Sequence, residues 1–216
     1  MGRLAGLLVA LLLGATAAGA QESGGTPGRF DFYVLALSWS PQYCAGQGAE
    51  RGSPQCDSGR RLAFTVHGLW PQYDRGFPSR CGPDRGAPRA DIDDAADLFP
   101  DPGLARHEWR THGTCSGLDP TAYFRAVRRA RDAVRIPEPL QAPERDGTTT
   151  ALSIERAFAA VNPGLRPDMM SVSCRRGALQ EVRVCFERDL SGFRPCPEVD
   201  RNASCRFGAI RVQAPR

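Results

Sequence analysis

The chain contains 216 residues and carries a formal net charge of +4. This length suits one domain with a sizeable core and argues against two domains of ordinary size. The mild positive charge favours anionic partners. It comes from arginine alone, the side chain that makes planar contacts with phosphate groups and stacks on bases.

Residues 1–20 have the pattern of a cleavable secretory signal. Arg3 precedes an apolar run from Leu4 to Ala18, and small residues end the segment at Ala20. The run is shorter than the ~20 residues that span a bilayer, and no basic stop-transfer cluster follows it, which disfavours a membrane anchor. We therefore expect cleavage after Ala20, one mature domain over 21–216 with no membrane contact, and a secreted or periplasmic location.

The eight cysteines predict a disulfide framework. An even number of cysteines in an exported chain favours four disulfides and no free thiol. Zinc is the alternative, but the chain has no pair of cysteines spaced C-x-x-C. The spacing leaves the pairing open. The cysteines are Cys44, Cys56, Cys81, Cys115, Cys174, Cys185, Cys196 and Cys205.

Two strands and a loop are expected in the first part of the mature chain. The β-rich run from Phe30 to Trp39 predicts one strand. A second, Leu62 to Val66, leads into a glycine turn and would place His67 at a strand end. Residues 74–89 are rich in glycine, proline and arginine, which indicates a long surface loop that Cys81 ties down.

Helices dominate the middle of the chain, and strands follow toward its end. Asp119 and Pro120 have the residue types of a helix cap and first helical position, and Tyr123, Val127 and Ala130 begin an apolar stripe. This order of elements predicts an α+β fold with a largely antiparallel sheet. Helices are expected at 92–98, 103–112, about 120–134 and 151–161, and late strands at 170–174, 179–186 and 207–212.

The three histidines of the chain fall in two short clusters. His67 opens the segment HGLWP, and His107 and His112 lie within HEWRTHGTC. Histidine has the unperturbed pKa best suited to proton transfer near neutrality. In a helix Glu108 and His112 share one face, and His107 lies one position round from Glu108. A single histidine is usually structural, but this clustering favours an acid–base site.

Two other reactive sites fit the residues less well. The zinc motif H-E-x-x-H needs histidines four residues apart, whereas His112 follows His107 by five, about 140° round the helix. No G-x-S-x-G segment supports a serine hydrolase. We therefore expect neither a metal nor another cofactor.

The two histidine segments closely resemble the signature motifs of the ribonuclease T2 family, HGLWP and HEWxKHGTC. The resemblance extends to the segment from Trp39 to Cys44, to Cys81, and to Leu179-x-Glu181-Val182-x-x-Cys185, and so covers nearly all the mature chain. It implies an antiparallel sheet flanked by helices in one disulfide-stapled domain. It also implies an endoribonuclease that converts RNA to a 2′,3′-cyclic phosphate and then to a 3′-phosphate.

The resemblance assigns roles to individual residues. It makes His112 the base, His67 the acid that protonates the 5′-oxygen, and His107 a phosphate ligand, while Glu108 supports the charged transition state. Trp70 would be a platform on which bases of any kind stack, whereas Trp109 is expected to pack in the core.

The chain departs from the family pattern at two substrate-binding positions. Thr111 stands where the family has a lysine, so a cation near the phosphate is missing, and Arg110 would have to turn about 100° round the helix to replace it. Gln72 stands where some relatives carry a carboxylate that favours one base. The departure at Thr111 bears on the reaction rate, and the departure at Gln72 bears on the base preference.

The resemblance also implies the disulfide pairing and the partners of the protein. Single-stranded RNA would be the substrate of a monomeric enzyme with broad base tolerance. The alternative function is a catalytically weak, ribonuclease-like binding or storage protein. The implied pairs are Cys44–Cys56, Cys81–Cys115, Cys174–Cys205 and Cys185–Cys196.

Overall fold

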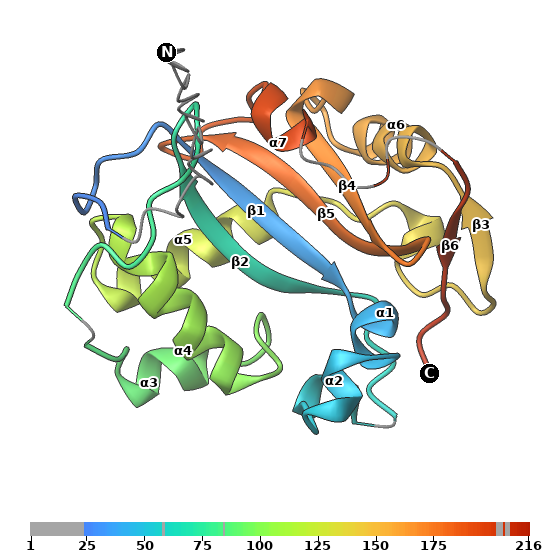
Figure 1. The fold of residues 1–216 in the computed structure, drawn as a ribbon, viewed down its shortest axis with the longest axis horizontal. Coiled ribbons are helices and arrows are strands. Elements are labelled where there is room, and N and C mark those ends of the chain that lie inside the picture. Colours follow the sequence, from blue (N-terminus) through green and yellow to red (C-terminus); the bar gives the residue numbers. More distant parts are fainter. Residues whose placement is uncertain (1–23, 58, 84, 202–204, 206–207) are drawn as a thin grey trace, which may run out of the picture.

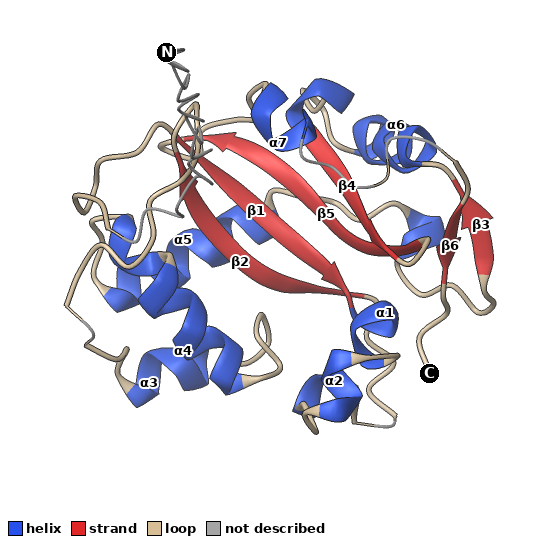
Figure 2. Cartoon of the chain, in the orientation of Figure 1, coloured by secondary structure: helices blue, strands red, loops and turns tan. Residues whose placement is uncertain are grey.

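A computed structural model describes residues 24–57, 59–83, 85–201, 205 and 208–216. They form one six-stranded sheet with helices packed around it (Figures 1 and 2). The strand order is β2-β1-β5-β6-β3, with β4 paired to β5. All the strand pairs are antiparallel except β5 with β6. The strands are β1 Phe32–Trp39, β2 Phe64–Gln72, β3 Gly147–Thr149, β4 Met170–Arg175, β5 Ala178–Glu187 and β6 Ile210–Val212.

This architecture confirms the predicted α+β class and the largely antiparallel sheet. The sheet also contains one parallel pairing, in which Ala178 of β5 lies beside Arg211 of β6. The predicted signal at residues 1–20 lies outside the described part of the chain. None of the described helices is long and apolar enough to cross a bilayer.

The predicted helices are found except near residue 92, and three short helices, Ser40–Cys44, Gln47–Glu50 and Pro197–Arg201, were not predicted. The N–H of Ala122 donates to the Asp119 carboxylate, which confirms the predicted cap of α5. The predicted helix at 92–98 was displaced: α3 begins directly after Pro88, and residues 95–98 form turns before Pro100, which disfavours helix in front of it. The helices are α1 Ser40–Cys44, α2 Gln47–Glu50, α3 Arg89–Asp94, α4 Pro102–Thr111, α5 Pro120–Asp132, α6 Ala151–Val161 and α7 Pro197–Arg201.

The two faces of the sheet have different surroundings. One carries alternate residues of β1, such as Leu35 and Leu37, and packs in the main core with Tyr123 and Val127 of α5. Figure 1 shows α5 crossing behind the sheet. The other face carries a small apolar cluster that includes Phe32, Val34 and Cys185, with Trp70 packed against it. This less covered face is where the two histidine clusters meet.

His67 lies in the middle of β2, so the prediction that it ends a strand was wrong. The register between β1 and β2 slips at this point, because Gly68 lies opposite Ala36 while Val66 lies opposite Leu37. His67 is left without a partner, as in a β-bulge. A bulge turns the side chain that it contains and lets the strand continue, so the glycine here does not end the element.

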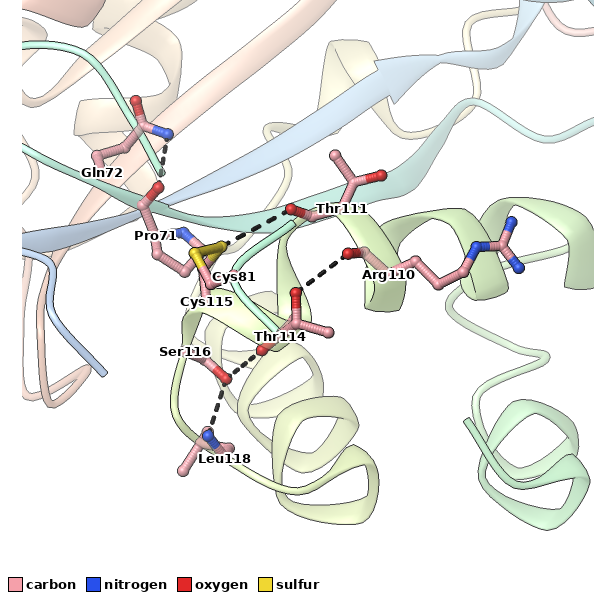
Figure 3. The surroundings of a disulfide bond; sticks show 10 residues. Pro71, Gln72, Cys81, Arg110, Thr111, Thr114, Cys115, Ser116 and Leu118 are labelled. Atoms are coloured by element: carbon pink, nitrogen blue, oxygen red, sulfur yellow. Dashed lines mark hydrogen bonds between the residues drawn. A yellow bond between two sulfur atoms is a disulfide. The ribbon is translucent and has the colours of Figure 1, made fainter. Parts of the chain in front are cut away.

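All four implied disulfides are present, and no cysteine is free. The Cys81–Cys115 bridge joins the irregular segment before α3 to the turn that follows α4 (Figure 3). The same segment is held by a backbone hydrogen bond of 2.8 Å from the Arg80 N–H to the Thr111 carbonyl. The long loop is therefore fixed against the end of the histidine-bearing helix.

Candidate active site

The three histidines line two neighbouring cavities. His112 lines a cavity of about 680 Å³, together with Trp70, Gln72 and Thr111. His67 lines a second cavity of about 760 Å³, together with Arg110. His107 lines both cavities. The Trp70 ring centroid lies 5.1 Å from that of His67 and 5.3 Å from that of His112. The structure thus brings the predicted site residues together from β2 and α4.

Two glycines of the signature segments make this packing possible. A side chain at Gly68 would overlap the Glu108 carboxylate and the Trp70 indole. A side chain at Gly113 would overlap the Trp109 ring, which is buried in the core as predicted. Each glycine therefore permits a close approach of β2 or of the turn after α4 to the aromatic side chains.

Glu108 is a buried carboxyl at the centre of the site. It is 1% exposed, accepts a hydrogen bond of 2.8 Å from the Trp70 indole, and lies 3.9 Å from His67 Nε2. Burial raises the pKa of Glu108 to about 7, although the charge of His67 and the Trp70 bond oppose the shift. Glu108 is thus able to exchange a proton or stabilise a positive charge on His67 near neutral pH.

The raised pKa of Glu108 predicts a pH-dependent effect of Glu108→Gln on stability. The pKa of Glu108 is 4.5 in the unfolded chain and about 7 in the folded protein. Between these two pH values the carboxyl is ionised in the unfolded chain and still protonated in the folded protein. The stability that the protonated carboxyl contributes is thus fully present below pH 4.5 and is lost as the pH rises through 7. Glutamine stays neutral and keeps an acceptor for Trp70, so the variant should gain about 3 kcal/mol at pH 8.

Urea unfolding at pH 4 and pH 8 measures this difference. The matched control is Glu187→Gln, since Glu187 is exposed at the end of β5 and should show no such dependence. An equal effect of Glu108→Gln at both pH values would contradict the burial argument.

His67 has a buried carboxylate partner that the sequence analysis did not assign. Its Nδ1 lies 2.5 Å from Glu181 Oε2, and the other oxygen of Glu181 accepts a bond of 2.7 Å from Arg183 Nε. Burial lowers the pKa of His67, but the bond and charge of Glu181, with the charge of Glu108, outweigh it and raise the pKa above 6.5. The arrangement favours the protonated form of His67, which is the form that a general acid needs.

The alternation of β5 was the signal that could have revealed Glu181. Glu181 and Arg183 lie two residues apart and so share a sheet face with Cys185. Glu181 is only 3% exposed, and a buried carboxylate needs a partner. His67 is the nearest titratable group that can provide one.

His112 has the opposite electrostatic setting. It follows the last residue of α4, and its Nδ1 is buried without a hydrogen-bond partner among the described residues. Burial, and then the charges of His67 and His107, lower the pKa of His112 to about 3. The imidazole is therefore neutral at ordinary pH, and its Nε2 is the nitrogen available to a substrate in the cavity. A neutral imidazole can act as a general base.

The remaining predicted residues lie around this pair. His107 Nε2 is 3.5 Å from the Thr111 hydroxyl, and burial followed by the charge of Arg80 lowers its pKa. Arg110 points away from Thr111 and from the disulfide (Figure 3). Gln72 lines the cavity of His112 together with Trp70, and its Nε2 donates to the Pro71 carbonyl. No three His, Cys, Asp or Glu side chains within the described ranges are grouped to hold a metal ion.

The chain is similar to known ribonucleases. The model of the Ribonuclease T2 family matches residues 30–196. A ribonuclease of Aeromonas hydrophila is 35% identical over 194 residues, which cover 89% of this chain and 88% of the relative. A ribonuclease-like storage protein of Panax ginseng is 26% identical over 203 residues, covering 83% and 81%.

Solved structures support the same fold. Ribonuclease MC1 from the seeds of bitter gourd superposes with a TM-score of 0.66 and 24% identity, covering 84% of this chain and 99% of its own. The family match extends over most of the chain, and the Aeromonas relative is similar over nearly its whole length. The chain therefore belongs to the ribonuclease T2 family and is a ribonuclease.

Proposed function

We propose that this ribonuclease cleaves single-stranded RNA by transphosphorylation, first to a 2′,3′-cyclic phosphate and then to a 3′-phosphate. The observation that carries the proposal is the pair of opposite pKa shifts on two neighbouring histidines. The pKa of His67 is raised above its usual value, and that of His112 is lowered to about 3. Over the range between them one imidazole holds a proton and the other is free to accept one.

In the first step the nucleophile belongs to the substrate. The ribose 2′-hydroxyl gives its proton to His112 while its oxygen bonds to phosphorus. The bond from phosphorus to the 5′-oxygen breaks, and His67 gives its proton to the departing oxygen. His107, which lines both cavities, is placed to donate a hydrogen bond to the phosphate, and Glu108 stabilises positive charge on His67.

In the second step the roles of the histidines reverse. Water attacks the cyclic phosphate, and His67, which is now neutral, takes the proton of that water. His112 returns its proton to the 2′-oxygen as the bond from phosphorus to that oxygen breaks. The protonation state of both histidines is thereby restored after hydrolysis.

The substrate is proposed to be single-stranded RNA with broad base tolerance. Trp70 lines the cavity of His112 and offers an indole to an unstacked base, a contact worth about 1–3 kcal/mol and tolerant of base identity. We further propose that the protein is secreted or periplasmic and that it is a monomer. The signal pattern of residues 1–20 and the four disulfides support export.

Digestion of matched RNA and DNA strands in excess chelator tests the proposal. Because the 2′-hydroxyl is the nucleophile, no metal-bound hydroxide is needed, and RNA should be cut at the rate seen without chelator. DNA of the same sequence should stay intact. Loss of RNA cleavage in chelator, restored by a divalent metal, would overturn the metal-free mechanism. RNA binding without any cleavage would favour the storage function.

A further inference from the structure

We infer that Arg80, supplied by the loop that Cys81 anchors, contacts the scissile phosphate and replaces the cation that Thr111 lacks. This inference rests on the proposed function, and it names a phosphate-binding residue for the same reaction. Arg110 is the candidate for this role that the sequence alone suggests. Arg80 is far from Thr111 in the sequence, and the disulfide and the loop bring the two together.

The backbone of Arg80 is fixed beside Thr111. The Arg80 N–H donates to the Thr111 carbonyl over 2.8 Å, and the next residue, Cys81, is bridged to Cys115. Arg80 also has a φ of +54°, a left-handed conformation that costs a non-glycine residue on the order of 1 kcal/mol or more. The position is thus held in an unfavourable conformation by two independent constraints.

The side chain of Arg80 faces the same cavity as the proposed base. Arg80, Thr111 and His112 all line the cavity of about 680 Å³, and His107 lines it too. The charge of Arg80 reaches His107, since it is one of the causes that lower the pKa of that histidine. Arg110 lines the second cavity instead, on the side of His67.

Arg80 also differs from the other arginine of this cavity. Arg183 lines it as well, but Arg183 is paired with Glu181 at 2.7 Å and lies over the Trp70 ring. The Arg80 side chain is exposed, and no described carboxylate forms an ion pair with it. Arg80 is therefore the cation of this cavity whose charge is available to an anion.

A positive charge at this position would stabilise the transition state. The lowered pKa values of His107 and His112 favour their neutral imidazoles, which supply no full positive charge to the cavity. A cation near the phosphorane stabilises the negative charge on its non-bridging oxygens more in the transition state than in the ground state. An arginine presents a planar pair of N–H groups to two such oxygens.

The test compares four purified variants on RNA in chelator. Arg80→Gln should lower kcat about 10-fold or more with a smaller change in KM, whereas Arg80→Lys should keep most of the activity. Arg106→Gln, at an exposed position of α4 that lines neither cavity, is the matched control and should stay within about twofold of the wild type. Adding Thr111→Lys to Arg80→Gln should restore much of kcat, because the lysine returns a cation to the same cavity.

Two further measurements separate this inference from loss of structure and from failure of the proposed function. Thermal unfolding should give similar midpoints for Arg80→Gln and Arg80→Lys, and Arg80→Gln should bind uridine 3′-monophosphate several-fold more weakly. An active wild type with unchanged kcat in Arg80→Gln, or no restoration by Thr111→Lys, would overturn the role of Arg80. A wild type that does not cleave RNA would overturn the proposed function, while weaker nucleotide binding in Arg80→Gln would still support a phosphate contact.

Discussion

Replacing His112 with alanine is expected to lower kcat on RNA by about 10²–10⁴-fold, the contribution of a well-placed base. The neutral imidazole, with a pKa of about 3, is the group proposed to take the proton of the 2′-hydroxyl. The loss should be nearly as large on uridine 3′-(4-nitrophenyl phosphate), because this substrate has the same nucleophile. Initial rates on both substrates provide the measurement.

Thermal unfolding serves as the control, since the substitution removes a partly buried ring beside Trp70. An unchanged fold with near-normal turnover would remove His112 from the role of base. A large loss on RNA with little loss on the nitrophenyl ester would instead mark His112 as the acid.

His67→Ala should lower kcat on RNA by a similar factor of about 10²–10⁴, but for a different reason. Its proton, held by the bond to Glu181, is proposed to go to the departing 5′-oxygen. A nitrophenolate leaves without protonation, so the loss on the nitrophenyl ester should be within about tenfold. Equal losses on the two substrates would contradict the assignment of His67 as the acid.

Glu181→Gln is a milder change in the same pair and serves as the companion variant. It removes the charge that raises the pKa of His67 and leaves the imidazole in place. His67 should then lose its proton at lower pH, so the alkaline limb of kcat/KM should move to lower pH. A limb that stays in place would show that His67 is not the group whose deprotonation ends activity.

Local chemistry made much of the fold predictable from the sequence. The helix over residues 120–132 begins where Asp119 and Pro120 supply a cap and a first turn, and its apolar stripe is buried as expected. The disulfide pairs followed the family resemblance and not the spacing of the cysteines, which allows many pairings. The order of elements was sufficient for the fold class.

The features that escaped prediction depend on contacts between distant segments. The bulge at His67 arises from the register between β1 and β2, which no local pattern around Gly68 reveals. Glu181 and His67 are 114 residues apart in the sequence. They meet because β5 and β2 lie on either side of β1 in the sheet. The position of Arg80 depends on the disulfide that folds its loop onto α4.

The histidine clusters predicted that these side chains lie together, as they do, and the structure adds a physical basis for the proposed roles of His67 and His112. His67 and His112 are identical side chains, and the sequence distinguishes them only through the family resemblance. Burial and neighbouring charges separate their pKa values in opposite directions, which assigns a proton to one and a lone pair to the other.

The most direct test of the central claim uses a DNA strand that contains one ribonucleotide, incubated with the wild-type protein in chelator. Attack by the 2′-hydroxyl predicts a single cut on the 3′ side of that ribonucleotide. Mass spectrometry should find a 2′,3′-cyclic phosphate on one fragment at early times and a 5′-hydroxyl on the other. Cuts at deoxynucleotides, or fragments with a 5′-phosphate, would contradict transphosphorylation by the two histidines.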